Sequence, residues 1–465
     1  MTQATAYSMR RHATAGDIAA LRAEWNALAA DVPFASYEWL ETWWRVYAPP
    51  AWHTDLAIVS VRDARHQLVG LAPWYLAHTG FGAELRFLGT GEVCSEYIGV
   101  LARPGCERAV GAALGHWLVG AHGPPATADS RALASDPPPR WNALAASGIP
   151  RGSAAMAAMV DVLAGGHCLV HRRPGLRCWS IPLPATWAEY RNLLSKSHRK
   201  QLARLDRRYF ATGRARLFEA TTPADVERGL DILAELHNRR RRSLGDAGRF
   251  RSPRFVAFHR ELADRFLATG QLRLYWLEVD ARPVAAEYQF RGRRAVFAYQ
   301  SGIEPATLEL EPGRLITMAT LRRAIDERAA EYDLLRGDEP YKSHWRAAPR
   351  ELDEIWVLRP SWVNRCRLLA LSATTALKQW HDRPLALAPH QNSAAEPGDL
   401  AARLPDSDGF ATPGGEPAPA PTAPCARVTL LHSNAAIAKT DLDVITSLVL
   451  PPGERRAYQR PAARQ

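Results

Sequence analysis

One short loop brings together several side chains that could carry out acid–base chemistry. After the strand-like run 331–336 (EYDLLR), the chain turns and presents Asp338, Glu339, Tyr341 and Lys342. A buried strand that ends in a cluster of ionisable side chains is a common way for α/β proteins to build a site. The alternative is a surface turn whose charges are solvated, and this segment alone leaves both interpretations open.

Candidates for a general base and a general acid follow from this cluster and from one nearby strand. Asp338 and Glu339 are the first candidates for the base, and Glu287, within the strand-like run 284–291, is another. Partial burial beside apolar residues would raise the pKa of such a carboxyl towards neutrality. Tyr341 or Tyr299 could protonate a leaving group. These residues predict proton transfer at the ends of neighbouring strands.

A candidate anion site lies at the start of a predicted helix. Gly313 and Arg314 follow Pro312, and a helix N-terminus offers backbone N–H groups and a positive dipole to a phosphate. We expect the ligand groove between the strand that ends at Ser301 and this helix. The alternative is that Pro-Gly is ordinary helix-start chemistry, and acidic Glu311 immediately precedes the pair.

Further candidates for binding are basic. Lys342 could hold a phosphate or a substrate carboxylate. His237 continues the apolar stripe of the predicted helix 223–241, so it is either a core histidine or a substrate contact. Arg239 and Arg240 begin a run of four arginines that could line the mouth used by a phosphate-bearing partner.

Size, charge and cysteine usage limit the possible classes of protein. At 465 residues the chain predicts two to three domains, and its net charge of +11 favours acidic partners. The six cysteines show no CxxC pair and no metal-ligand spacing, which predicts a reducing compartment and no metal. The N-terminus lacks the apolar core of a signal peptide, and no run is long enough to span a bilayer. We therefore expect a cytoplasmic protein.

The order of the predicted elements divides the chain into three parts. Helices and then a strand meander, which includes a predicted strand at 97–101, occupy residues 1–184. A second block of helices, three meandering strands, a helix and the strand 331–336 occupies 185–383. From 384 to 465, Pro, Ala, Gly and Ser dominate and predict a disordered tail. The fold class is thus α/β (α+β), with mixed sheets flanked by helices.

A basic helix opens the second block. Between 195 and 216 the only acidic residue is Asp206, against eight cations: Lys196, Arg199, Lys200, Arg204, Arg207, Arg208, Arg214 and Arg216. This imbalance indicates either a solvated face or a surface that binds a polyanion.

Several stretches in order resemble a known family. They are FASYEWLETWW, LVGLAPWYL and LRFLGTG in the first block, then LHNRRRRSLGDAGRF, FHRELADRFLATGQLRLYWLEVDARPVAAEYQF, AYQSGIEP and DLLRGDEPYKSHW. Together they resemble the cellulose-biosynthesis CelD-type acyltransferases, which belong to the GNAT superfamily and are related to FemAB-type aminoacyl transferases. The resemblance covers roughly residues 13–358.

The resemblance implies two tandem GNAT-like domains and transfer of an acyl group to an amine. The donor would be acyl-CoA, with acetyl-CoA as one form, or an acyl-carrier protein; in FemAB relatives it would be an aminoacyl-tRNA. A catalytically degenerate scaffold in exopolysaccharide production is a further alternative. The expected partners are a small-molecule amine and one of these donors, without DNA. In this interpretation, the phosphate contacts are Gly313, Arg314, Ser301, Arg239 and Arg240.

Overall fold

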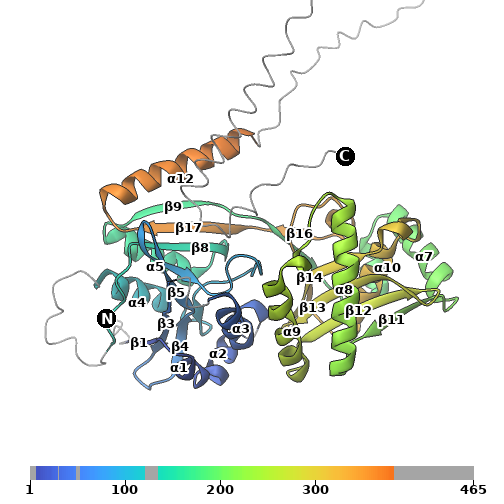
Figure 1. The fold of residues 1–465 in the computed structure, drawn as a ribbon, viewed down its shortest axis with the longest axis horizontal. Helices are drawn as coiled ribbons and strands as arrows, with labels where there is room; N and C mark the ends of the chain where they lie inside the picture. The colour runs from blue at the N-terminus through green and yellow to red at the C-terminus, as the bar shows by residue number, and fades with distance from the viewer. Residues whose placement is uncertain (1–6, 30, 49–52, 121–134, 382–465) are drawn as a thin grey trace, which may run out of the picture. The chain divides into compact units, whose positions relative to one another are not determined.

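The computed structural model describes residues 7–29, 31–48, 53–120 and 135–381 (Figure 1). The described residues up to Leu369 form one compact unit that contains all three sheets. The predicted tail 384–465 lies outside the described residues. Within those residues, no helix is long and apolar enough to cross a membrane.

Two sheets are built mainly from the first part of the chain. The smaller has the order β1-β3-β4-β7 and the larger the order β2-β5-β6-β8-β17-β9. Their strands are β1 (Ser8–His12), β2 (Thr54–Leu56), β3 (Ile58–Arg62), β4 (Leu68–Ala72), β5 (Trp74–Thr79), β6 (Gly82–Phe87), β7 (Leu101–Ala102), β8 (Ala143–Pro150), β9 (Leu169–Pro174) and β17 (Leu352–Leu358). The helices in this part are α1 (Ala15–Ala19), α2 (Arg22–Leu28), η1 (Pro33–Ala35), α3 (Tyr37–Tyr47), α4 (Glu107–Gly120) and α5 (Ala154–Gly165).

The third sheet has seven strands in the order β11-β12-β13-β14-β15-β10-β16. These are β10 (Cys178–Pro182), β11 (Ala215–Glu219), β12 (Leu272–Val279), β13 (Arg282–Arg291), β14 (Ala295–Ile303), β15 (Glu331–Arg336) and β16 (Ala348–Arg350). The helices are α6 (Trp187–Leu193), α7 (Lys196–Leu205), η4 (Asp206–Phe210), α8 (Pro223–Ser243), η5 (Arg249–Arg251), α9 (Pro253–Ala268), η6 (Pro305–Leu310), α10 (Pro312–Asp326) and α11 (Tyr341–His344). The last helix, α12 (Trp362–His381), follows β17 and contacts the six-stranded sheet, where Nη2 of Arg367 donates to Glu84 of β6 at 2.7 Å. The expected α/β class, with mixed sheets flanked by helices, is confirmed.

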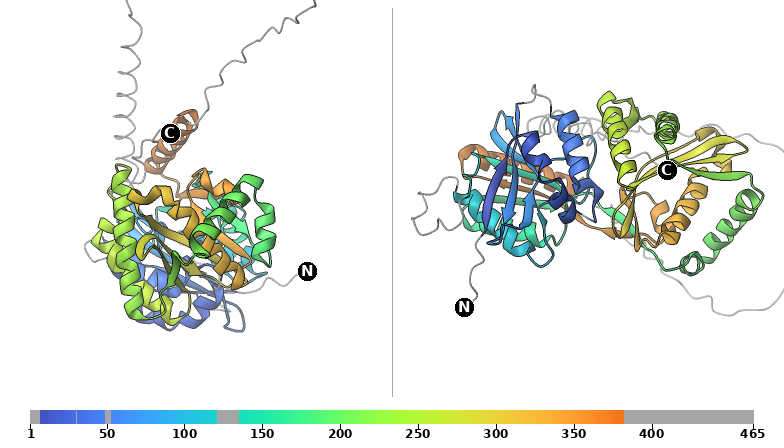
Figure 2. Two further views of the ribbon diagram at one scale, coloured as in Figure 1. Left: turned by 90° about the vertical axis from the view of Figure 1, so that its right-hand side faces the viewer. Right: turned by 90° about the horizontal axis from the view of Figure 1, so that it is seen from below.

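Strand alternation gives the seven-stranded sheet two buried faces. Ala286, Tyr288 and Phe290 of β13 pack in one core with α8 and α9, whereas Ala285 packs in another core with α7 and α10. Because successive side chains point to opposite faces, each face receives its own layer of helices (Figure 2).

The strands are exchanged across the predicted boundary at residue 184. β17, which follows the seven-stranded sheet in sequence, lies between β8 and β9 of the six-stranded sheet (Figure 1). Conversely, β10 precedes the boundary but pairs with β15 and β16. The division into domains 1–184 and 185–383 therefore stays a prediction, and strand pairing crosses it in both directions.

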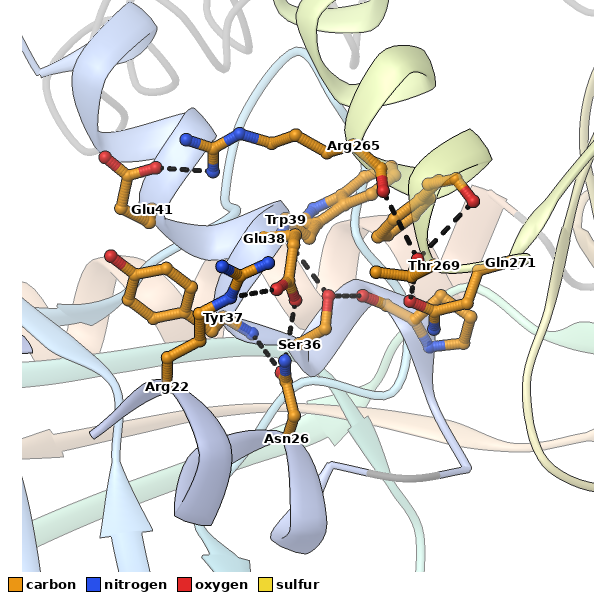
Figure 3. Close-up of polar contacts among 12 residues, drawn as sticks. Arg22, Asn26, Ser36, Tyr37, Glu38, Trp39, Glu41, Arg265, Thr269 and Gln271 are labelled. Carbon is orange, nitrogen blue, oxygen red and sulfur yellow. Dashed lines mark hydrogen bonds and ion pairs between the residues drawn. The ribbon is translucent and has the colours of Figure 1, made fainter. Parts of the chain in front are cut away.

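A buried polar contact joins α3 to α9 within the compact unit (Figure 3). Glu41 of α3 is buried, and its Oε2 accepts a hydrogen bond from Nη1 of Arg265 at 2.6 Å. One turn earlier, the buried carboxylate of Glu38 accepts from Nε of Arg22 at 2.7 Å and from Nδ2 of Asn26 at 2.8 Å. Every carboxylate that α3 buries therefore has a charged partner, as burial of an ion requires.

One predicted strand is wrong. The run 97–101 forms no strand before β7 begins at Leu101. The backbone at Cys94 and Tyr97 has φ of 51° and 58°, in the left-handed region that a strand cannot contain. The apolar pattern marked burial correctly, because Tyr97, Ile98 and Val100 are all buried.

Candidate functional site

The site is centred on two parallel strands that separate. β14 and β15 pair at only three positions: Ala295 with Glu331, Val296 with Tyr332, and Phe297 with Asp333. Beyond these pairs both strands continue without pairing to each other, as far as Ile303 and Arg336. We call this region of separation the fork. It exposes one backbone edge of β14 to whatever lies between the strands.

A β-bulge lies at the point where the strands separate. On β13, Tyr288 pairs with Gln300 and its neighbour Gln289 pairs with Ala298, so Tyr299 has no opposite residue. A bulge leaves backbone groups outside the ladder and changes the direction of the strand, and bulges are common beside active sites. The fork therefore combines a free strand edge with an irregular backbone.

Glu287 is buried next to the fork, between β13 and α10. Its Oε2 accepts hydrogen bonds from the hydroxyl of Tyr332 at 3.0 Å and from Oγ1 of Thr320 at 3.3 Å, and Nε2 of Gln289 also donates to it. Oγ1 of Thr317 donates to Oε1 at 3.4 Å. Burial raises the pKa of Glu287 and outweighs these hydrogen bonds. This is the environment that a general base working near neutral pH needs.

Tyr341 is a predicted site residue whose pKa responds to the charge of Glu287. Desolvation of its hydroxyl, then the charges of Glu339 and Glu287, raise the pKa of Tyr341. The residue retains 48% exposure and begins α11. A side chain that is exposed and also senses the charge of Glu287 is well placed to meet a ligand.

Asp338 and Glu339 do not have the burial that we expected. Their side chains are 51% and 56% exposed. Asp338 accepts hydrogen bonds from Nη2 of Arg177 at 3.0 Å and Nε1 of Trp179 at 2.9 Å, which hold it at the surface. Of the three candidate bases, Asp338, Glu339 and Glu287, only Glu287 is desolvated.

Lys342 has a structural role that the sequence did not indicate. Its buried ammonium donates to the backbone oxygens of Leu335 at 3.1 Å, Arg336 at 2.9 Å and Gly337 at 2.9 Å. The carboxylate of Glu339 also lies 3.1 Å from the ammonium, so groups of the chain itself engage all three of its protons. The geometry favours Lys342 as a brace for the end of β15, rather than as the substrate contact we predicted.

A carboxylate from the chain itself lies beside the start of α10 and binds Arg314. Glu311 is the residue before the helix and has a φ of 57°. Its carboxylate is bound by Gln201, Arg204 and Arg314. Gly313 has room around it, because an added Cβ would meet only Cγ2 of Ile303, at 3.9 Å. A phosphate at this helix start would thus have to share Arg314 with Glu311.

His237 connects α8, β14 and η5. Nδ1 lies 2.9 Å from the backbone oxygen of Ser301, and Nε2 accepts the N–H of Arg249 at 3.3 Å. Since a carbonyl oxygen only accepts, Nδ1 carries the proton and the imidazole is neutral. Burial lowers the pKa of His237 to about 4, consistent with that state. His237 is therefore a core histidine that positions other groups, and the phosphate contact expected at Ser301 stays a prediction.

The remaining predicted residues are dispersed. Tyr299 projects from the face of the sheet opposite Glu287, and its hydroxyl donates to the oxygen of Val93 at 2.5 Å. Arg239 is held by Glu235 and Glu304. Neither arrangement favours contact between these two side chains and a ligand that lies beside Glu287.

Sequence reasoning missed most of the residues that surround Glu287. A signal was present: Glu287 and Gln289 are polar residues two apart in an otherwise apolar strand, so they share one buried face. Thr317 and Thr320 are three apart on α10 and share one side of that helix. Tyr332 was assigned only to the strand core, although its hydroxyl is a member of the cluster.

The basic helix presents an exposed face. Lys196, Lys200, Arg207 and Arg208 are exposed and form no ion pair within the described part of the chain. Two of the eight cations have acidic partners: Arg204 pairs with Glu311, and Arg214 pairs with Asp280. The one acidic residue of the segment, Asp206, pairs with Arg322 of α10. The excess positive charge is therefore concentrated on α7 and η4. Among the residues that the structure covers, no group of three or more His, Cys, Asp or Glu could hold a metal ion.

Comparisons with known proteins identify the domain that carries the fork. Residues 196–343 match the family described as "Acetyltransferase (GNAT) domain". The fold is similar to that of FemX, with a TM-score of 0.50 and 10% identity over 74% of this chain and 96% of that one. A conserved protein of unknown function from Bacteroides thetaiotaomicron VPI-5482 gives 0.47 and 12% over 76% and 100%. A tandem GNAT protein from the clavulanic acid biosynthesis pathway gives 0.37 and 14% over 76% and 99%.

A search of curated protein sequences found no match. Residues 196–343 thus match a GNAT-type acetyltransferase domain, within a unit whose fold is similar to that of FemX.

Proposed function

We propose that this protein is an N-acyltransferase that moves an acyl group from a thioester donor to an amine, with Glu287 as the proton acceptor. The donor is an acyl-CoA or an acyl-carrier protein. The CelD-type resemblance supports a role in polysaccharide or cell-envelope biosynthesis, with residues 1–184 as a second GNAT-like domain.

The reaction needs no nucleophile from the protein. The amine nitrogen attacks the carbonyl carbon, a C–N bond forms, the C–S bond breaks, and the thiolate leaves. One proton passes from the amine to the Glu287 carboxylate, and the thiolate takes up a proton. Tyr341, which is half-exposed and whose pKa is raised in part by the charge of Glu287, is our candidate for that second transfer.

The observation that carries this proposal is the position of Glu287 beside the fork. Burial raises the pKa of Glu287, which lies within the matched residues 196–343, and four hydrogen-bonding side chains fix its orientation. The free edge of β14 at the bulge supplies backbone N–H groups that could polarise the donor carbonyl.

A thiol-release assay tests the proposal. Acetyl-CoA and longer acyl-CoAs, and an acylated carrier protein, are supplied with a panel of amines, and free thiol is measured. We expect turnover with at least one thioester, and a loss of about 10²- to 10⁴-fold in kcat for Glu287→Gln. No thiol release with any thioester would reject the thioester donor.

A second candidate is transfer from aminoacyl-tRNA, which the FemAB-type resemblance implies. The specific observation in its favour is the basic face of α7 and η4, where Lys196, Lys200, Arg207 and Arg208 lack acidic partners within the described part of the chain. Binding of charged tRNA should weaken steeply with added salt, because each neutralised phosphate releases counterions. Salt-independent binding would contradict this candidate.

A further inference from the structure

An arginine-rich segment, residues 238–254, folds into a pocket that the acyl-transfer proposal does not use. It contains seven arginines and one acidic residue, Asp246. A surface pocket is lined by Asn238 and Arg242 at the end of α8 and by Arg251 of η5. Two guanidinium groups from different elements therefore converge on one recess.

The cations of this pocket are available to a ligand. Arg242 and Arg251 are both exposed, and neither forms an ion pair with any residue that the structure describes. Neighbouring charges are already used: Asp246 lies 3.6 Å from Arg241, and Arg239 is bound by Glu235 and Glu304. Like-charged guanidinium groups that converge without an acidic partner repel each other, and an anion between them relieves the repulsion.

The pocket is built rather than incidental, because two features hold its walls together. The backbone at Gly248 has a φ of +79°, and an added Cβ would lie 2.6 Å from Oδ1 of Asn238. Glycine therefore lets the loop before η5 approach α8 closely. Oδ1 of Asn238 is buried and has no hydrogen-bond partner in the described part of the chain.

His237 is the second feature and connects the pocket to the fork. Its Nε2 accepts the N–H of Arg249, the first residue of η5, and its Nδ1 donates to the backbone oxygen of Ser301 on β14. Ser301 is the residue that pairs with Glu287 on β13. The arginine pocket is thus anchored, through one imidazole, to the strand beside the candidate base.

We infer that Asn238, Arg242 and Arg251 form a binding site for a phosphate or diphosphate group of a small molecule. A recess with two planar guanidinium groups suits a compact oxyanion, which each arginine can bind through two N–H groups. At the expected phosphate site, the start of α10, Glu311 already binds Arg314, so this pocket offers a phosphate another anchor. The inference stands on observations separate from those for acyl transfer.

Calorimetric titration with pyrophosphate tests the site directly and needs no turnover. We expect the full chain to bind pyrophosphate, and the double variant Arg242→Ala/Arg251→Ala to lose about tenfold or more in affinity. The matched control is Arg207→Ala/Arg208→Ala, which removes two exposed arginines from η4 and should leave the affinity within about twofold. Arg242→Lys/Arg251→Lys keeps the charge but lacks the planar pair of N–H donors of a guanidinium, and it should give an intermediate loss of affinity.

Two results would overturn the inference. The first is equal pyrophosphate affinity in the wild type and in Arg242→Ala/Arg251→Ala, with unchanged near-ultraviolet circular dichroism. The second is a double variant that loses binding of a short oligouridylate but not of pyrophosphate, which would make the surface a contact for a nucleic-acid backbone. Pyrophosphate binding that depends on the pocket, without thiol release, would support this site and reject the thioester proposal, so the two failures are distinguishable.

Discussion

The hydroxyl of Tyr97 donates a hydrogen bond of 2.6 Å to Oδ2 of Asp333, and both residues are buried. Oδ1 of the same carboxylate accepts the backbone N–H of Leu335 at 2.7 Å. Asp333 lies on β15 directly after Tyr332, so the two side chains point to opposite faces of the sheet. The fork therefore has a buried carboxyl on each face: Glu287 under α10, and Asp333 against the loop before β7.

Removing the hydroxyl of Tyr97 should destabilise the protein. Tyr97→Phe leaves a buried carboxyl without one of its donors, and we expect a loss of about 1–3 kcal/mol in the free energy of unfolding. Urea denaturation at pH 7 measures it. The matched control is Tyr209→Phe, because the buried hydroxyl of Tyr209 has no partner among the described residues. Equal losses in the two variants would contradict the assigned hydrogen bond.

The same carboxyl should make stability depend on pH. Burial raises the pKa of Asp333 to about 6, above its usual value of 3.8. The folded state therefore binds this proton more tightly than the unfolded state. The resulting stabilisation is present below pH 3.8 and is lost as the pH rises through 6, a change of about 3 kcal/mol. Asp333→Asn should remove this component from the pH profile of unfolding, and an unchanged profile would refute it.

Substitution of Glu287 should separate catalysis from folding. Glu287→Gln keeps the shape and the acceptor oxygen, so the fold should persist while kcat falls about 10²- to 10⁴-fold. The KM for the donor should change little, since Glu287 is not proposed to bind it. Asp338→Asn/Glu339→Gln is the control, and because those carboxylates are half-exposed we expect nearly full activity. If Glu287→Gln stays active and Asp338→Asn/Glu339→Gln does not, the base is Asp338 or Glu339, in the loop after β15.

A buried histidine should weaken the fold in acid. His259 is 1% exposed, both of its ring nitrogens lack partners in the described part of the chain, and burial lowers its pKa to about 3. The unfolded state therefore binds the proton more tightly, and stability is lost as the pH falls from about 6.5 towards 3. At pH 5 the loss is about 2 kcal/mol relative to pH 7.5.

His259→Phe should make unfolding less sensitive to acid by that amount. Its aromatic neighbours, Phe255 and Tyr288, suit a phenyl ring. Urea denaturation at pH 7.5 and pH 5 measures the difference, and the exposed His116→Gln serves as the control. The idea fails if His259→Phe and the wild type lose the same stability between the two pH values.

Close packing of α8 on β14 depends on Gly302. An added Cβ would lie 2.5 Å from the backbone nitrogen of His237, so Gly302→Ala must push the helix away from the strand. We expect a loss of about 1–3 kcal/mol, together with weaker pyrophosphate binding, because His237 anchors η5. Gly165→Ala is the control, since nothing lies within 4 Å of a Cβ there. If both variants are equally stable, the contact is looser than described.

The sequence was sufficient for most of the elements in the second block and for its likeness to the GNAT acetyltransferase family. The three meandering strands, the helix that starts at Pro312 and the strand 331–336 are all confirmed, because periodicity and turn residues are local signals. The match of residues 196–343 to the GNAT acetyltransferase family supports the coarser part of the resemblance. The CelD-type assignment stays a prediction.

The roles of single residues could be predicted less well from the sequence, because they depend on contacts between residues that are distant in the chain. Asp338 was expected to be buried, but Arg177, far away in the chain, holds it at the surface. Lys342 was expected to face a ligand, but it bonds backbone oxygens that only the folded turn brings within reach. Glu287 was named correctly as a candidate, yet its cluster depends on Tyr332, which lies across β14.

The exchange of β17 has a consequence for synthesis on the ribosome. β8 is complete at residue 150, but its partner β17 begins only at Leu352, about two hundred residues later. Until that segment emerges, one edge of β8 remains unpaired, and β9 has no neighbour in the sheet. A nascent chain therefore carries open strand edges while about two hundred residues are translated, a period in which pairing with another chain competes with completion of the fold.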